Sequence, residues 1–192
     1  MWRNIQGFDV RLMIRGGVLK SELKYERAKV ANRSLKILEK EDPSHTHLSP
    51  QLCKLIQAYE VLHWPNAESV TDARVKENDL AELQVEREFQ FLQKRKELIL
   101  DRLTALGLKQ QDLALLLNHS KSYSSELING LRPLSSQDLI LIHRPLSIKL
   151  EDLFMAFLPL KIQERVRSSM RKLASKNVAI KGKGLKLVKI QG

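Results

Sequence analysis

Residues 106–134 read LGLKQQDLALLLNHSKSYSSELINGLRPL, and their spacing is the most informative in the chain. Gly107 can end a preceding helix, because glycine adopts the left-handed conformation that closes many helices. The spacing then predicts a helix over 110–117, a tight Asn-His turn and a second helix over 120–129, which Gly130 stops. Two short helices joined by a turn of this length are typical of a helix-turn-helix.

The second of these helices is expected to turn a polar face outward. Ala114 is small enough for the two helices to cross at close range. The outward face carries Lys121, Ser122, Ser125 and Glu126, which are short or flexible polar groups able to reach base edges in the major groove of DNA. The same pattern fits an ordinary helical bundle, where short helices joined by Asn and Ser turns are common. Spacing alone therefore leaves both a DNA-binding and a purely structural interpretation open.

The preceding residues predict a helical hairpin and a long third helix. Apolar residues recur at helical spacing over about 18–40 and again over 49–65, which predicts two helices joined by a short loop. Residues 66–79 are polar and acidic without clear periodicity and are interpreted as a linker or exposed segment. A long helix is predicted over about 80–106, with its charged run at 94–96 on a solvated face.

Charge is distributed unevenly along the chain, whose formal net charge is +11. Residues 159–192 contain ten basic and one acidic residue, a net charge of +9, whereas residues 108–158 are neutral. A strongly basic chain favours an anionic partner, for which nucleic acid is the first candidate. The tail has two interpretations. It is a helix to about Ala174 followed by a flexible basic arm that grips phosphates, or it is a solubilising or poorly ordered extension without a dedicated partner. Residues 183–190 could pair as an edge strand or stay disordered.

Composition excludes several classes of protein. Eight glycines and six prolines in 192 residues exclude collagen-like and low-complexity chains, and no apolar run approaches the roughly 18 residues of a membrane span. The N-terminus lacks the apolar core of a signal peptide. The single cysteine, Cys53, cannot form an internal disulfide, and a reducing cytoplasm fits best. The histidines are scattered and no glycine-rich phosphate loop occurs in its required context, so we expect no metal, no cofactor and no catalytic residue.

Two stretches resemble one family of DNA-binding proteins. Residues 106–134, followed by 137–154, resemble the phage-repressor (Xre/Cro) family of helix-turn-helix domains, and most closely its HigA-type antitoxin branch. Residues 52–65, LCKLIQAYEVLHWP, are similar to a stretch of the larger HigA-type antitoxins. The resemblance implies an all-α chain with four regions: an N-terminal helical hairpin region at 1–65, a linker and the start of the long helix at 66–91, a five-helix repressor-type helix-turn-helix domain at 92–158, and a basic tail at 159–192.

Taken position by position, the resemblance also implies which residues contact DNA. Gln110 would contact phosphate and support the second helix of the motif, while Tyr123 and Arg132 would approach phosphates. At position 124 the family usually has Val or Ile, where this chain has Ser124. The residues that would face bases and backbone are Ser120, Lys121, Ser122 and Ser125.

The function implied by the resemblance is that of an antitoxin. It would repress its own operon by binding double-stranded operator DNA, and it would neutralise a HigB/RelE-like ribonuclease toxin by steric binding. We expect a homodimer on half-sites about 34–36 Å apart, cytoplasmic and associated with the nucleoid, with no membrane partner and no enzymatic activity. Two alternatives remain: a stand-alone Xre-family regulator without a toxin, and a protein-interaction module with a degenerate helix-turn-helix.

Overall fold

The computed structural model describes residues 7–66, 70–155 and 160–174. No β-strand occurs in these ranges, so the all-α expectation is confirmed for the described part of the chain. The chain divides into two compact units, Met1–Met155 and Ala156–Gly192. The larger unit contains the helical hairpin and the helix-turn-helix.

The N-terminal part of the larger unit is a group of short and medium helices: α1 (Val10–Gly16), α2 (Glu22–Glu41), the short 3-10 helix η1 (Pro43–His45) and α3 (Leu48–His63). Helices α2 and α3 pack against each other, as the hairpin prediction requires. Helix α2 begins four residues later than predicted, because the hydroxyl of Ser21 accepts the amide hydrogen of Lys24 and caps it. Helix α1 was not predicted, since seven residues are too few for an apolar period to show.

The long helix α4 extends over Asp72–Ala105, which is 34 residues and about 50 Å. It begins eight residues before the predicted start, so the interpretation of 72–79 as a linker is wrong. The Thr71 hydroxyl accepts the amide hydrogen of Arg74, at 3.3 Å, and Asp72 lies in the first turn, where a negative charge is favourable. The N-cap at Thr71 therefore starts α4 in a segment, 72–79, whose apolar residues show no helical spacing.

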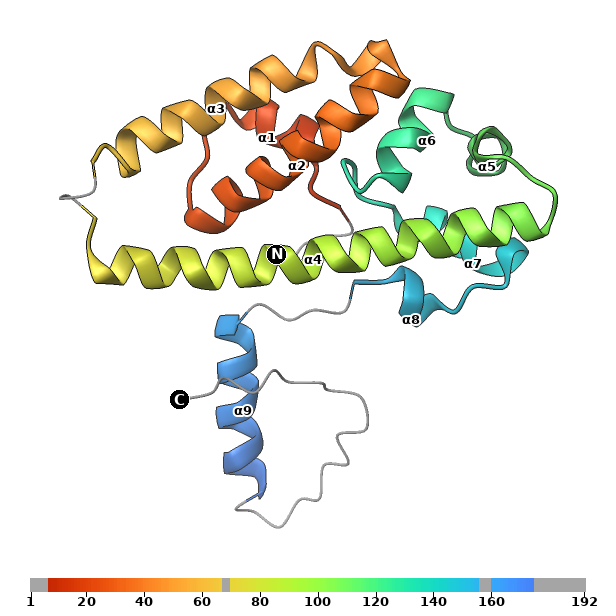
Figure 1. The fold of residues 1–192 in the computed structure, drawn as a ribbon. Coiled ribbons are helices and arrows are strands. Elements are labelled where there is room, and N and C mark those ends of the chain that lie inside the picture. The colour runs from red at the N-terminus through yellow and green to blue at the C-terminus, as the bar shows by residue number, and fades with distance from the viewer. Residues whose placement is uncertain (1–6, 67–69, 156–159, 175–192) are drawn as a thin grey trace. The chain divides into compact units, whose positions relative to one another are not determined.

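Helices α5 (Gln110–Leu117) and α6 (Lys121–Ile128), which follow α4, match their predicted positions closely. They are followed by α7 (Ser136–Leu146) and α8 (Leu150–Leu153). The Ser120 hydroxyl accepts the amide hydrogen of Tyr123, at 3.2 Å, and so caps α6 as predicted. Asn118 closes α5 in the left-handed conformation. Figure 1 shows α2 and α3 along the N-terminal half of α4 and α5 to α8 around its C-terminal half.

Two hydrophobic cores lie on opposite halves of α4. The first is built mainly from α1, α2 and α3, and α4 adds Val85 and Leu92 to it. The second is built from α5, α6, α7 and α8, and α4 adds Ile99 and Leu103. The first core also receives Leu131, which follows α6. One continuous helix therefore supports both cores.

Arg95 does not lie on a solvated face as the charged run at 94–96 suggested. Its side chain is fully buried, and Nη1 donates a hydrogen bond to the carbonyl of Leu153, at 3.3 Å. Its guanidinium lies over the ring of Phe91, 5.7 Å from the centroid. Burial lowers the pKa of Arg95 to about 10. The prediction was wrong because this face of α4 meets the end of α8, a contact between residues 58 apart.

Gly130 provides a first testable prediction, because two features constrain it. Its φ of 69° is in the left-handed region, and a Cβ there would lie 2.8 Å from Cδ1 of Leu92. We expect Gly130→Ala to lower the free energy of unfolding by about 2 kcal/mol or more, through backbone strain and displacement of a buried leucine. Gly107 has the same φ with open space around it, so Gly107→Ala should cost only the strain, about 1 kcal/mol. Equal losses for the two variants in urea unfolding would contradict this account.

The smaller unit contains α9 (Leu160–Ala174), as in the interpretation of the tail that begins with a helix to about Ala174. The suggested edge strand at 183–190 and the basic arm lie outside the described residues. No helix among the described residues is long and apolar enough to cross a membrane.

Candidate nucleic-acid interface

Helices α5 and α6 pack as the two helices of a helix-turn-helix. Ala114 of α5 is buried. Ser124 of α6 is also buried, at the position where the family that the chain resembles usually has Val or Ile. The Ser124 hydroxyl has no hydrogen-bond partner among the described residues. Gln110, at the start of α5, donates a weak hydrogen bond from Nε2 to Oγ of Ser125, at 3.4 Å. Gln110 thus contacts α6 directly.

The N-terminal end of α6 is open to solvent. Ser120 and Lys121 are both exposed. The half-buried ring of Tyr123 lies 4.4 Å from the His119 ring, centroid to centroid, and the Arg132 guanidinium lies over the Tyr123 ring at 4.1 Å. This stack holds two of the predicted phosphate-contacting groups, Tyr123 and Arg132, next to each other.

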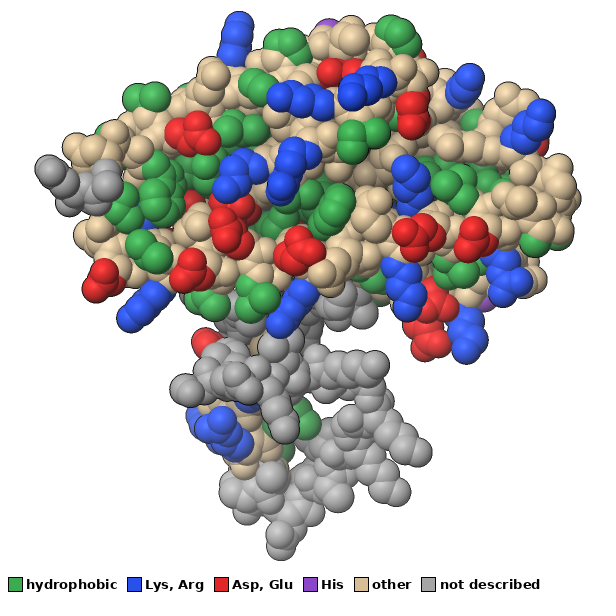
Figure 2. Space-filling view, in the orientation of Figure 1, with side chains coloured by type: hydrophobic (Ala, Val, Ile, Leu, Met, Phe, Trp, Pro, Cys, Tyr) green, Lys and Arg blue, Asp and Glu red, His purple; other side chains and the backbone are tan. Residues whose placement is uncertain are grey.

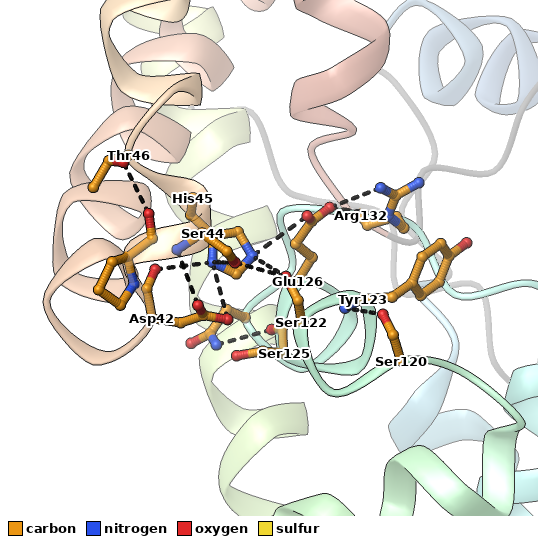
Figure 3. A network of polar contacts seen from close by, with 12 residues as sticks. Asp42, Ser44, His45, Thr46, Ser120, Ser122, Tyr123, Ser125, Glu126 and Arg132 are labelled. Carbon is orange, nitrogen blue, oxygen red and sulfur yellow. Dashed lines mark hydrogen bonds and ion pairs between the residues drawn. The ribbon is translucent and has the colours of Figure 1, made fainter.

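The outward face of α6 is covered farther along the helix. Ser125 and Glu126 are only 8% and 2% exposed, so the expectation that both face solvent is wrong. The half-buried Ser122 places its Oγ 3.1 Å from Oγ of Ser44 and 3.1 Å from Nε2 of His45. Both partners belong to η1, at the turn between α2 and α3. Figure 3 shows His45 between Asp42 on one side and Ser122 and Glu126 on the other.

Glu126 is the centre of a buried charge cluster. Arg11 of α1 donates from Nη2 to Oε1 at 2.6 Å and from Nε to both carboxylate oxygens at 3.1 and 3.2 Å. Arg132 donates from Nε to Oε2 at 3.0 Å, and Nε2 of His45 lies 3.4 Å from Oε1. Burial raises the pKa of Glu126, but the hydrogen bonds and charges of Arg11 and Arg132 outweigh burial, so the pKa lies below its usual value.

Asp42 adds a negative charge to the same region. Hydrogen bonds from the hydroxyl and amide of Ser44 lower its pKa, and the charges of His45 and Lys121 contribute in the same direction. The carboxylate of Asp42 therefore interacts electrostatically with Lys121, the exposed cation at the start of α6.

Backbone contacts join the N-terminal segment to the end of α6. The amide of Phe8 donates to the carbonyl of Gly130 at 2.7 Å, and the amide of Val10 donates to the carbonyl of Leu131 at 2.9 Å. A Cβ at Gly7 would lie 2.5 Å from the carbonyl oxygen of Arg132. Only glycine allows so close an approach of two backbones.

Arg11, Ser44 and His45 were therefore missed as members of this region. Each touches α6 across a separation of between 77 and 115 residues. No local pattern in the sequence reports a contact of that kind. The predicted residues that lie near one another are Gln110 with Ser125, and Tyr123 with Arg132, while Ser120 and Lys121 stay at the open end of α6.

The other described residues of the larger unit form no metal-binding cluster, and the large cavity among them has walls of mixed charge. Among the described residues, no group of three or more His, Cys, Asp or Glu side chains could hold a metal ion. A cavity of about 840 Å³ lies between α2 and α4, and its walls mix acidic groups such as Glu26 and Glu82 with the basic Lys29 and Arg33. Figure 2 shows basic and acidic side chains interspersed over this face around apolar surface. Charge of one sign does not gather there.

Comparison with known proteins identifies the second part of the larger unit. Residues 99–153 match the family model described as Helix-turn-helix. This range begins in the C-terminal half of α4 and ends with α8, so it contains the second hydrophobic core. No curated protein and no solved structure matches the chain. The chain thus contains a repressor-type helix-turn-helix domain, which suggests a DNA-binding transcriptional regulator.

Proposed function

We propose that this protein is a transcriptional regulator that binds operator DNA through the N-terminal end of α6. The observation that carries the proposal is the α5–α6 pair inside the matched range 99–153. Lys121 is exposed beside the N-cap Ser120, which is where a recognition helix contacts base edges. In this proposal Ser122 also contacts DNA, Gln110 supports α6, and Tyr123 and Arg132 approach the phosphates, whereas the buried Ser125 makes no contact with DNA.

The more specific form of the proposal is a HigA-type antitoxin. Its support is the resemblance of two separate stretches, 52–65 and 106–134, in the order of that family. The protein would repress its own operon as a homodimer in the cytoplasm and would block a HigB/RelE-like toxin by steric binding. The test is co-expression of any small reading frame adjacent to the gene. If the product of that reading frame is toxic, co-purifies with this protein and loses its toxicity on co-expression, the antitoxin proposal is supported. If the product is harmless and does not bind, the protein is a stand-alone regulator.

A second candidate function is favoured by one observation. Ser125 and Glu126 are buried, so they do not face a DNA groove. In this second candidate function the helix-turn-helix is a scaffold within a protein-interaction module and does not bind DNA. Such a module would show no preference for any DNA sequence. Comparing the affinity of the chain for an upstream duplex and for a scrambled duplex therefore separates the transcriptional regulator from the interaction module.

Lys121 provides the prediction that tests DNA reading. We expect Lys121→Ala to weaken binding of the full chain to a duplex from its own upstream region about tenfold, since a good base contact contributes about 1–3 kcal/mol of discrimination. Binding to a scrambled duplex should change much less. Both affinities are measured by fluorescence anisotropy over a range of salt concentrations, because phosphate contacts make affinity depend steeply on salt.

Lys149 is the matched control for this measurement. It is an exposed lysine in the same domain, and its only described ion pair is a 3.7 Å surface contact with Glu151. Lys149→Ala removes the same charge and should leave the preference for the upstream duplex intact. Equal losses of preference in the two variants would exclude Lys121 as a reading residue. Equal binding of the wild-type chain to upstream and scrambled DNA would favour the interaction module.

A further inference from the structure

Two N-terminal segments cover the outward face of α6, and together they are called the N-terminal cover: Gly7–Arg11 and Asp42–His45. The first segment bonds to the backbone at Gly130 and Leu131 and to the carboxylate of Glu126. The second places Ser44 and His45 against Ser122. The outward positions of α6 beyond Lys121 are therefore occupied from within the chain.

This arrangement keeps α6 beyond its first turn out of a DNA groove. The major groove is about 12 Å wide, and an α-helix with its side chains is about 10–12 Å across. The groove has no room for a second backbone layer on top of the helix. Ser44 lies within hydrogen-bonding distance of Ser122, where a base edge would have to lie. In the closed arrangement only the first turn of α6, with Ser120 and Lys121, is available to DNA.

The contact between the cover and α6 itself is polar. It consists of the ion pairs of Arg11 and His45 with Glu126 and of the contacts of Ser44 and His45 with Ser122. Beyond α6, two backbone hydrogen bonds reach Gly130 and Leu131, and Phe8 and Val10 lie with Leu131 in the first hydrophobic core. The two hydrophobic cores are separate clusters, and Leu131, which follows α6, belongs to the first of them. Polar contacts between separately packed cores resemble interfaces between domains, which open more readily than a continuous core.

We propose that the N-terminal cover is an autoinhibitory element that competes with DNA for the outward face of α6. The inference rests on the proposed function, because it assumes that α6 reads DNA once the face is free. Duplex DNA and the cover then bind the same surface in a mutually exclusive way. The apparent affinity for DNA equals the intrinsic affinity multiplied by the open fraction, so any change that favours the open state tightens binding.

A disulfide clamp tests the proposal directly. Ser44→Cys and Ser122→Cys are introduced together in the full chain, because the two hydroxyl oxygens are 3.1 Å apart and the side chains face each other. Cys53→Ser is included to remove the native thiol. We expect a mild oxidant to cross-link the two positions, and the oxidised protein to bind the upstream duplex at least about tenfold more weakly than the reduced protein. The Ser44→Cys, Cys53→Ser variant under the same redox conditions controls for effects of the oxidant.

Arg11 provides an independent test in the opposite direction. Arg11→Ala removes the strongest contact of the cover with Glu126, and we expect the upstream duplex to bind about tenfold more tightly. Arg15→Ala removes the same charge from an exposed position on the same helix. Loss of a positive charge ordinarily weakens binding to DNA. Tighter binding in Arg11→Ala and slightly weaker binding in Arg15→Ala would therefore separate opening from electrostatics.

Each outcome of these experiments decides one point. Cross-linking with weaker binding of the upstream duplex on oxidation supports the cover, as does tighter binding of Arg11→Ala than of Arg15→Ala. No cross-link under oxidant overturns the closed contact itself. A cross-linked protein that binds the upstream duplex as tightly as the reduced one overturns the autoinhibition. Cross-linking without sequence preference in either redox state overturns the proposed DNA reading, and the contact between η1 and α6 is then structural.

Discussion

Replacement of Glu88 by alanine is expected to lower the free energy of unfolding by about 3 to 5 kcal/mol. Glu88 on α4 accepts two hydrogen bonds from Arg27 on α2, with Nη2 to Oε1 at 2.6 Å and Nε to Oε2 at 2.7 Å. The side chains are only 4% and 10% exposed, respectively. Removing the carboxylate would leave a buried guanidinium without its partner, which is far more costly than losing an exposed pair. Urea unfolding of the full chain measures the loss.

Two control variants test whether the loss in Glu88→Ala comes from breaking a buried ion pair. Glu97 is exposed on the same helix, so Glu97→Ala should change the free energy of unfolding by less than about 0.5 kcal/mol. The double replacement Arg27→Met, Glu88→Leu removes both charges and fills the space with apolar atoms. It should be much closer to the wild type than Glu88→Ala is. A loss below about 1 kcal/mol in Glu88→Ala would show that the pair is not buried in solution.

Replacement of Glu126 by alanine should lower the free energy of unfolding by about 3 kcal/mol. The carboxylate is buried, and its loss leaves the guanidinium groups of Arg11 and Arg132 facing each other. These side chains are 37% and 22% exposed, so they can turn toward water. For that reason the expected loss lies at the lower end of the range for buried ion pairs. Glu126→Gln, which keeps the shape, separates the charge from the volume of the side chain.

The effect of Glu126 should depend on pH in a defined direction. Its pKa in the folded protein is lower than the ordinary 4.5. The carboxylate therefore stabilises the fold fully above pH 4.5, and this contribution disappears as the pH falls through the lowered value. The difference in unfolding free energy between the wild type and Glu126→Gln should be large at neutral pH and vanish in acid. A difference that stays constant across this range would contradict the ionised cluster.

Local signals explain why the helix-turn-helix could be predicted from the sequence. Its boundaries depend on residues next to the helices they define, such as Ser120 as the N-cap of α6 and Gly130 with its positive φ. Its core follows from the apolar period over α4 and α5. Such features act within a few residues, so a single sequence contains them in full.

Contacts between distant residues explain what could not be predicted. The outward face of α6 has the composition of a solvated surface, but η1 and α1, about 80 and 115 residues earlier, lie against it. Arg95 likewise lies in a charged run that predicts a solvent-exposed side chain, but it is buried in the structure. A charged residue is buried when a partner from elsewhere satisfies it, and a single sequence does not report that partner.

The shared helix α4 has a consequence for the order of events during synthesis. Most of the first hydrophobic core is complete once the chain has emerged to Leu92, whereas the second core needs residues as late as Leu153. Domains generally fold from the N-terminus as the ribosome releases them. The segments around Arg11 and His45 can therefore be in place before α6 has been translated. A newly made α6 would then meet its own chain before it meets any DNA.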